Sequence, residues 1–311
     1  MENHLGEIWS LFHFLMPGFL GSQKRFTELY RTPIEKHGDA ERLAQLRARI
    51  TPFMLRRTKA LVAHELPPKV ETVLRVQLSG AQANLYETIR LGMEKTVRDA
   101  LAAKGLAKSQ ITILDALLKL RQVCCDPRLV PLDAAKKVKT SAKLDQLMEL
   151  LPEMLAEGRR ILLFSQFTSM LTLIEQELQK RKLQWAKLTG QTRKRDEVIE
   201  RFTSGEVPLF LISLKAGGVG LNLPQADTVI HYDPWWNPAV EAQATDRAHR
   251  IGQTQSVWVL KLVAQGTIEE RILALQERKA ELASSMYSGA SARKEPLFTE
   301  DDLAELLRPL E

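Results

Sequence analysis

Short apolar runs alternate with amphipathic stretches through the second half of the chain. The apolar runs predict strands at residues 161–164, 185–188, 209–212, 228–232 and 257–263. Between them, apolar positions three and four residues apart predict helices over 141–156, 169–181, 193–202, 238–250 and 267–283. Buried strands that alternate with helices are typical of a parallel sheet covered by helices on both faces. We therefore expect an α/β domain in this half of the chain.

The first half of the chain has mostly helical spacing. Basic and apolar residues follow this spacing from 26 to 59, and two or three further helices are expected over 81–125, interrupted near Gly105 and Ser109. Residues 70–79 differ, because apolar and polar side chains alternate there as in a half-buried strand. No second strand is predicted near it in the sequence, so this strand has no evident sheet.

Composition narrows the class of protein. Hydrophobic residues make up 44% and charged residues 26% of the 311 positions, which is typical of a soluble chain of about two domains. No stretch approaches the ~20 apolar residues of a membrane helix, and Glu2 and Glu7 stand where a signal peptide is basic. The two cysteines are adjacent, at Cys124 and Cys125, which excludes a disulfide framework and a cysteine zinc site. The net charge of +6 permits a polyanionic partner.

The loop after the strand at 209–212 is a candidate phosphate site. Ligands bind beyond the carboxyl ends of parallel strands, and this loop carries Ser213, Lys215 and three glycines within 217–220. Glycines let backbone amides approach a phosphate closely. The same cluster also suits a tight strand-to-helix turn, so both interpretations stay open.

The loop after the strand at 228–232 contains two adjacent tryptophans, Trp235 and Trp236, in a proline-bounded turn. Such rings either stack against a partner or cover the core, and core packing is the favoured role of at least one of them. Asn237 followed by Pro238 predicts the start of a helix, with asparagine as the N-cap and proline at the first helical position.

The predicted helix at 238–250 places several polar residues three or four positions apart, so that they share one face: Gln243, Asp246, Arg247 and Arg250. Two guanidinium groups there can clamp phosphate oxygens. The alternative is an ordinary solvated basic face. Because the helix begins at the carboxyl edge of the sheet, beside the glycine loop, we favour phosphate binding.

Other expected parts of a nucleotide site are missing from the sequence. It contains no Gly-Lys dipeptide and therefore no Walker A loop. The acidic pair Asp196 and Glu197 falls in a predicted helix rather than at a strand end, which argues against an acidic magnesium site. The residues thus predict half of an active site, a domain that contacts phosphate but cannot hold a nucleotide by itself.

Several segments, in this order, resemble known motifs. Residues 243–253, Gln-x-x-Asp-Arg-x-x-Arg-Ile-Gly-Gln, resemble motif VI of the Swi/Snf-type DNA-translocating ATPases of helicase superfamily 2. The segment 213–223 is similar to motif V, 161–167 to motif IV and 188–192 to the motif that follows it. Residues 2–68 contain stretches similar to the end of the first lobe of these motors.

The resemblance implies a motor of two RecA-like lobes, with ATP between them and double-stranded DNA across both. The chain would then comprise the tail of the first lobe with a helical protrusion at 1–80, a helical linker or protrusion at 81–138, the second RecA-like helicase C-terminal domain at 139–285, and a tail at 286–311. A helix at 300–307 in this tail resembles a brace that returns toward the first lobe. The strand at 70–79 would complete the sheet of the first lobe, most of which is absent.

The resemblance also assigns residues. Arg247 and Arg250 would be arginine fingers, and the ATP interface would include Gln243, Gly218 and Asp246. DNA contacts are implied for Ser165, Gln166, Thr189, Gly190, Ser213, Lys215, Trp235 and Trp236. ATP and Mg²⁺ would be held mainly by the absent first lobe, and no metal site is expected in this chain.

The implied activity is that of a DNA-dependent ATPase, and the chain alone is expected to be inactive. Its partners would be double-stranded DNA, the N-terminal RecA-like lobe and a DNA-bound protein substrate. It would be intracellular and associated with DNA in a nucleoid or nucleus, neither secreted nor bound to a membrane. Two alternatives remain: a strand-separating helicase of the same superfamily, and a non-enzymatic module that binds DNA or another partner.

Overall fold

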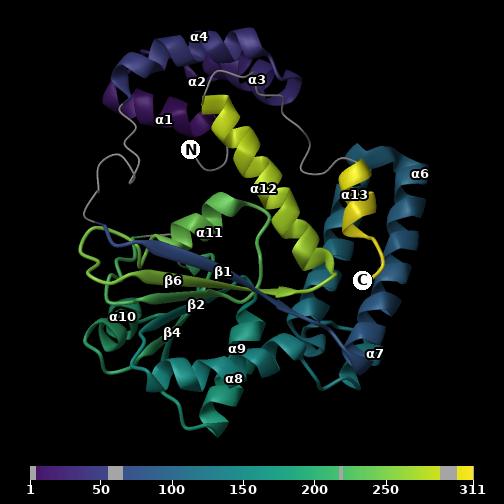
Figure 1. Ribbon diagram of the computed structural model, residues 1–311. Coiled ribbons are helices and arrows are strands. Elements are labelled where there is room, and N and C mark those ends of the chain that lie inside the picture. The colour runs from purple at the N-terminus through teal and green to yellow at the C-terminus, as the bar shows by residue number, and fades with distance from the viewer. Residues whose placement is uncertain (1–4, 55–65, 217–219, 288–299, 311) are drawn as a thin grey trace. The chain divides into compact units, whose positions relative to one another are not determined.

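The computed structural model describes residues 5–54, 66–216, 220–287 and 300–310 (Figure 1). The chain divides into two compact units, one formed by residues 1–64 and 278–299 and the other by residues 65–277 and 300–311. Within the described residues, no helix combines the length and the apolar character needed to cross a membrane.

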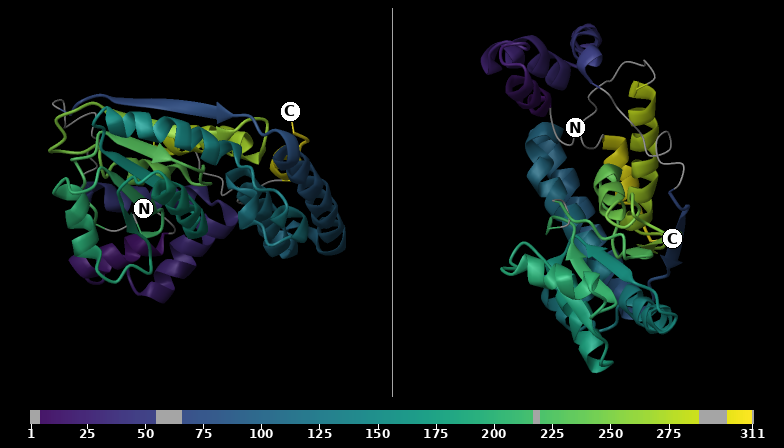
Figure 2. Two further views of the ribbon diagram at one scale, coloured as in Figure 1. Left: turned by 90° about the horizontal axis from the view of Figure 1, so that it is seen from below. Right: turned by 90° about the vertical axis from the view of Figure 1, so that its left-hand side faces the viewer.

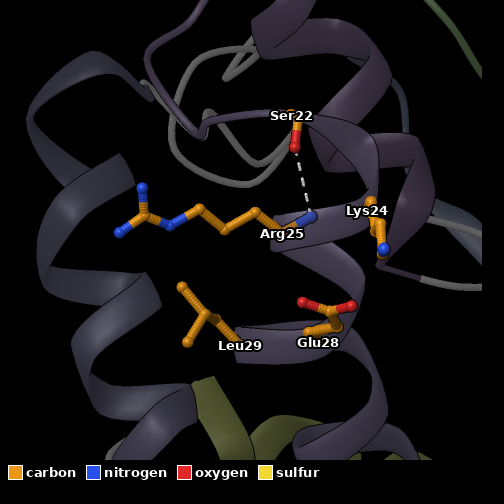
Figure 3. A pocket seen from close by; sticks show the side chains of 5 residues that line it. All are labelled: Ser22, Lys24, Arg25, Glu28 and Leu29. Carbon is orange, nitrogen blue, oxygen red and sulfur yellow. Dashed lines mark hydrogen bonds between the residues drawn. The ribbon is translucent and has the colours of Figure 1, made fainter.

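The first unit is helical, as its sequence spacing predicts. Its described elements are α1 (Gly6–Leu15), α2 (Gln23–Phe26), a π-helical turn (Thr27–Arg31), α3 (Thr32–His37), α4 (Ala40–Ile50) and a 3₁₀ turn (Thr51–Phe53). Phe12, Phe26 and Leu46 are buried in its core. Ser22 caps α2 by accepting a hydrogen bond from the backbone N–H of Arg25, in a surface pocket lined by charged side chains (Figure 3).

The second unit is built on a six-stranded parallel sheet in the order β1-β6-β5-β2-β4-β3. The strands are β1 (Lys69–Val76), β2 (Ile161–Ser165), β3 (Trp185–Leu188), β4 (Leu209–Ser213), β5 (Thr228–His231) and β6 (Val257–Ala264). The helices are α6 (Gly80–Cys125), α7 (Asp133–Lys136), α8 (Ala142–Ala156), α9 (Thr168–Lys180), α10 (Arg195–Thr203), α11 (Pro238–Thr245), α12 (Ile268–Tyr287) and α13 (Glu300–Leu306), with a 3₁₀ turn at Pro127–Leu129. Of α12, the residues up to 277 belong to this unit.

Helices cover both faces of this sheet. One apolar core lies between the sheet and α8 and α9, and a second lies between the sheet and α10 and α11 (Figure 1). Both faces of β2 and β4 are therefore buried, which is why their sequences are continuously apolar rather than alternating. The predicted RecA-like parallel α/β fold is confirmed.

Strand β1 corrects the sequence interpretation. We expected residues 70–79 to belong to a sheet that is mostly absent, but β1 pairs in parallel with β6, from Lys69 opposite Val257 to Val76 opposite Ala264, and forms one edge of the sheet (Figure 2). The side chain of Thr72 accepts a hydrogen bond from Trp258 Nε1 at 3.0 Å. The partner strand is far away in the sequence, so local patterning could not reveal it.

The long helix α6 contains the predicted interruption. Gly105 has a φ of +68°, a left-handed conformation that glycine adopts without a steric penalty. Ser109 Oγ lies within hydrogen-bond distance of the carbonyl oxygens of Ala100, on the other side of this kink, and of Gly105, at 2.9 and 2.8 Å, and its one proton is shared between them. The α6 segment is thus two helices that meet at Gly105.

The residues that follow the C-terminal helix α13 are bonded to α6 and α12. Arg90 of α6 donates to the carbonyl oxygen of Leu307 at 3.0 Å. Arg271 of α12 donates to the carbonyl oxygens of Arg308 and Pro309, at 2.8 and 2.7 Å. Two arginines with little exposed surface therefore anchor the end of the chain to the RecA-like unit.

A buried ion pair joins α8, α12 and the end of β6. Lys143 Nζ lies 2.9 and 2.8 Å from the two carboxylate oxygens of Glu269, and both side chains are almost completely buried. Glu269 also accepts a hydrogen bond from the backbone N–H of Ala264 at 2.8 Å. Lys143 Nζ lies 4.8 Å from the ring centre of Tyr232, the residue that follows β5. The pair thus lies directly under the carboxyl edge of the sheet.

Candidate functional site

The loops after β2 and β5 are joined at the carboxyl edge of the sheet by one buried carboxylate. Asp233, two residues after β5, accepts hydrogen bonds from Ser165 Oγ and from the backbone N–H of Gln166, at 2.5 and 3.2 Å. Only 2% of its surface is exposed. We had not assigned Asp233 a role, although its place just beyond a buried strand was a signal for one.

The loop after β4 is fixed at its start. The backbone N–H of Leu214 donates to the carbonyl oxygen of Ser165 at 3.0 Å, and Ser213 Oγ accepts from the backbone N–H of Ala216 at 3.3 Å. Gly218, one of the predicted ATP-interface residues, lies outside the described residues. Gly220 has a φ of +67°, so this position favours glycine for conformational reasons. Both the turn and the phosphate interpretation of this loop therefore remain compatible with its geometry.

The two candidate arginines meet this loop at a single atom. Arg247 Nη1 and Arg250 Nη1 each donate to the carbonyl oxygen of Leu221, at 3.3 Å. In return, the backbone N–H of Leu223 donates to the carbonyl oxygen of Arg247 at 2.9 Å. Both arginines are partly exposed. The segments that resemble motifs V and VI are thus hydrogen-bonded to each other, with the guanidinium groups near the surface.

The backbone that carries these arginines differs from the prediction. We expected a helix over 238–250, but α11 ends at Thr245, and residues 246–252 form successive tight turns. Gln253 stabilises the turns by donating to the carbonyl oxygens of Ala226 and Ala248, at 2.7 and 3.1 Å. Arg247 and Arg250 therefore do not share a helix face, and it is the turns that bring them together.

The residues predicted beside the arginines are also near the surface. Gln243 on α11 and Asp246, at its C-terminal end, are each partly exposed. The nearby His249 donates from Nε2 to the carbonyl oxygen of Pro67, 2.8 Å away, which ties the turn to the segment before β1. This contact gives His249 a structural role.

The candidate DNA-contacting residues fall into two groups. The side chains of Ser165, Thr189 and Ser213 are buried, and each is already used inside a loop. Gln166 is partly exposed, whereas Gly190 and Lys215 are fully at the surface. The first group shapes the loops, and the second group is the one that a ligand can reach.

The two tryptophans are held by a residue that the sequence interpretation missed. The guanidinium carbon of Arg121, on α6, lies 5.2 Å from the ring centre of Trp235 and 4.9 Å from that of Trp236. Arg121 Nη2 donates to the carbonyl oxygen of Pro234 at 2.9 Å. Trp235 also packs against the core beneath α10 and α11, which confirms the core-packing prediction for one of the two rings.

A buried glutamate supports the same loop from below. Gln276 Nε2 of α12 donates both to the carbonyl oxygen of Trp235 and to Oε2 of Glu241 on α11. Burial is the largest influence on Glu241 and raises its pKa to about 7, and Lys261 and the hydrogen bond from Gln276 oppose this rise. Glu241 therefore changes its charge near neutral pH.

This pKa predicts a pH-dependent stability. The folded protein binds a proton at Glu241 more tightly than the unfolded chain does, so the stabilisation is complete below pH 4.5 and is lost as the pH rises through 7. The Glu241→Gln variant lacks this titration. Between pH 4.5 and 8, we expect the unfolding free energy of the wild type to fall by about 3 kcal/mol relative to that of the variant. Urea unfolding at several pH values measures this difference, and parallel pH profiles would contradict the prediction.

No metal site or reactive thiol emerges from the part of the chain that the structure describes. There, no three His, Cys, Asp or Glu side chains gather as metal ligands would. Cys124 and Cys125 are fully buried, and burial raises the pKa of the Cys125 thiol well above its usual value. We therefore assign the cysteines to packing.

Comparison with known proteins identifies two family models. Residues 1–129 match the SNF2-related domain, and residues 142–252 match the helicase conserved C-terminal domain. A putative ATP-dependent helicase/translocase of Bacillus subtilis, YwqA, is 41% identical over 289 residues, which cover 91% of this chain and 31% of that protein. A human SWI/SNF-related regulator of chromatin, subfamily A member 1, is 37% identical over 298 residues, which cover 91% and 28%. The chain thus spans about a third of the length of these relatives.

Solved structures with the same fold include two from Sulfolobus solfataricus. The SWI2/SNF2 ATPase core in complex with double-stranded DNA is 36% identical, with a TM-score of 0.60, and the match covers 93% of this chain and 61% of that one. The C-terminal domain of the SWI2/SNF2 ATPase is 30% identical, with a TM-score of 0.59, and the match covers 78% of this chain and 99% of that one.

Proposed function

We propose, from the premise that this chain belongs to the SNF2 family of ATP-dependent helicases, that it is the second motor lobe, with part of the first, of a translocase that moves along double-stranded DNA. The observation that carries the proposal is the shared hydrogen bond of Arg247 and Arg250 to Leu221. It holds two guanidinium groups, partly exposed, next to a glycine-containing loop at the carboxyl edge of a RecA-like sheet. This is the arrangement expected of one half of a nucleotide site.

On the ATP side, Arg247 and Arg250 act as arginine fingers. Their planar, permanently charged groups stabilise the negative charge that spreads over the transferring phosphoryl group. Gln243, Asp246 and Gly218 line the same interface. Because the chain has no Gly-Lys dipeptide, the β- and γ-phosphates and the Mg²⁺ ion are held by the other lobe. Closure of the lobes brings the arginines to the nucleotide, and opening after hydrolysis withdraws them.

On the DNA side, the exposed groups contact phosphates. Lys215 offers an exposed side-chain donor, and Gly190 lets the backbone come close to the DNA. The side-chain nitrogen of Gln166 is buried in the structure, so its contact with DNA requires the side chain to turn outward. Ser165, Thr189 and Ser213 are buried and set the shape of the loops that carry these groups, in addition to the DNA contacts expected of them. Trp235 and Trp236 lie at the groove of the bound DNA. A DNA-bound protein is the further substrate that such a motor displaces.

Removal of one phosphate contact should change both the affinity for DNA and its dependence on salt. We expect Lys215→Ala to weaken DNA binding equally for unrelated sequences and to reduce the slope of log affinity against log salt by about 1. Fluorescence anisotropy titrations over a range of salt concentrations measure this slope. Lys136→Ala is the matched control, because Lys136 is a surface residue paired with Asp133 on α7. This variant should leave the slope unchanged. A Lys215 variant with the wild-type slope would remove this residue from the DNA contact.

The activity itself is tested with the longer parent protein that contains both lobes. We expect ATP hydrolysis that double-stranded DNA stimulates, displacement of a third strand from a triplex, and no turnover by the 311-residue chain alone. Unwinding of a plain duplex would instead indicate a strand-separating helicase. Motor-like ATP turnover by the isolated chain would contradict the half-site proposal, and DNA binding without DNA-stimulated turnover in the two-lobed protein would favour a non-enzymatic module.

A further inference from the structure

One buried cation touches two of the loops at the carboxyl edge of the sheet. The guanidinium carbon of Arg121 lies 4.9 Å from the ring centre of Trp236, 5.2 Å from that of Trp235 and 5.9 Å from that of Phe167. The tryptophans follow β5 and Phe167 follows β2, whereas Arg121 comes from α6. Three elements that are remote in the sequence therefore meet at one side chain.

Arg121 is held there by more than ring contacts. Its Nη2 donates to the carbonyl oxygen of Pro234 at 2.9 Å, within the loop that carries the tryptophans. Only 4% of the residue is exposed, and burial lowers the pKa of the guanidinium while the nearby carboxylate of Asp233 opposes this. An arginine keeps its charge even so. Asp233 in turn binds the loop after β2 through Ser165 and Gln166.

The arginine fingers and the tryptophan loop have different hydrogen-bond partners. Arg247 and Arg250 are bonded to Leu221, in the loop after β4. The tryptophan loop is bonded to Arg121 above and, through the carbonyl oxygen of Trp235, to Gln276 of α12. A disturbance of Arg121 therefore acts directly on the tryptophan loop, whereas Arg247 and Arg250 are bonded to the loop after β4.

We propose that Arg121 is a positioning residue that holds the Trp235–Trp236 loop in the conformation that engages DNA, and so sets the DNA concentration at which ATP turnover is stimulated. This inference rests on the proposed function. A desolvated cation over aromatic rings is a strong contact, and only a planar fork can stack on the rings while donating to Pro234. Without Arg121, a smaller fraction of the molecules has the loop in the conformation that engages DNA. The apparent affinity for DNA falls in proportion to this fraction.

The test uses the two-lobed protein with Arg121→Met and Arg121→Lys, and Arg98→Met as the matched control, because Arg98 lies in the other half of α6, before the kink at Gly105, with its side chain 70% exposed. We expect the DNA concentration for half-maximal stimulation to rise about tenfold in Arg121→Met and by a smaller factor in Arg121→Lys. The KM for ATP should change less than twofold in both. The control should match the wild type in each measurement.

A double-mutant cycle with Trp236→Ala separates positioning from general destabilisation. If Arg121 acts through the tryptophan loop, Arg121→Met adds little to the DNA half-saturation shift of Trp236→Ala, so the effects are not additive. Additive shifts, or a fall in maximal turnover with unchanged half-saturation, would overturn the inference. Should Arg121→Met fail to fold, Arg121→Lys enters the same cycle. A wild type that DNA does not stimulate would instead refute the proposed function.

Discussion

Replacement of Arg250 by alanine is expected to lower the ATP turnover of the two-lobed motor by about 10³-fold or more. An arginine finger acts on charge that develops in the transition state, so its loss affects the chemical step more than ground-state binding. DNA affinity measured without nucleotide should change less than twofold, because Arg250 is assigned to the nucleotide and its guanidinium is bonded to Leu221 in the absence of ligand. Steady-state ATPase assays and nucleotide-free DNA titrations provide the two measurements.

Two further variants make this result specific. Arg250→Lys keeps the positive charge but loses the planar fork, so it should recover only a minor part of the turnover. Arg98→Ala removes an exposed arginine whose contact is an ion pair with Glu94 on α6, and it should leave turnover unchanged. Wild-type turnover in Arg250→Ala would remove this residue from the mechanism.

The largest effect on stability is expected at Lys143. The Lys143→Met variant leaves the carboxylate of Glu269 buried without its cation, and loss of one partner of a buried pair typically costs about 3–5 kcal/mol. The backbone N–H of Ala264 still donates to Glu269, but one neutral donor does not replace a charge. Urea unfolding, followed by the circular dichroism of the second unit, measures the loss.

The paired variant shows where this cost arises. Glu269→Gln combined with Lys143→Met removes both charges and keeps an acceptor for Ala264, so it should recover most of the lost stability. Lys136→Met is the matched control, because Lys136 pairs with Asp133 at the surface and should change stability by less than about 0.5 kcal/mol. A loss below 1 kcal/mol in Lys143→Met would show that the buried pair is not needed for stability.

The sheet was predictable because its physical cause is local. Strands buried on both faces are continuously apolar, and the runs at 161–164 and 209–212 coincide with β2 and β4. The pairing of β1 was not predictable, because its partner β6 lies far along the chain and an alternating pattern does not say which strand it will join. The end of α11 was missed for a related reason, since the turns after Thr245 are held by Gln253 from beyond them.

The residues of the motifs could be predicted from the sequence, but the residues that hold them in place could not. We expected Arg247 and Arg250 to lie beside the glycine-containing loop after β4, and both are hydrogen-bonded to Leu221 in that loop. Arg121 and Glu241 escaped notice because a charged residue in a helix looks like a surface residue until its partners are known. Their roles come from rings and amides supplied by other elements, such as Gln276 of α12. Tertiary contacts of this kind leave no spacing in the sequence.

The most direct test of the account is the position of the Arg250 guanidinium in the two-lobed motor bound to DNA, ADP and aluminium fluoride, which mimics the transferring phosphoryl group. We predict that the guanidinium group leaves the carbonyl oxygen of Leu221. It should then lie within about 3 Å of the fluorides, which take the place of the oxygens of the phosphoryl group. An Arg250 side chain that still binds Leu221 while the closed nucleotide site contains no group from this chain would contradict the account.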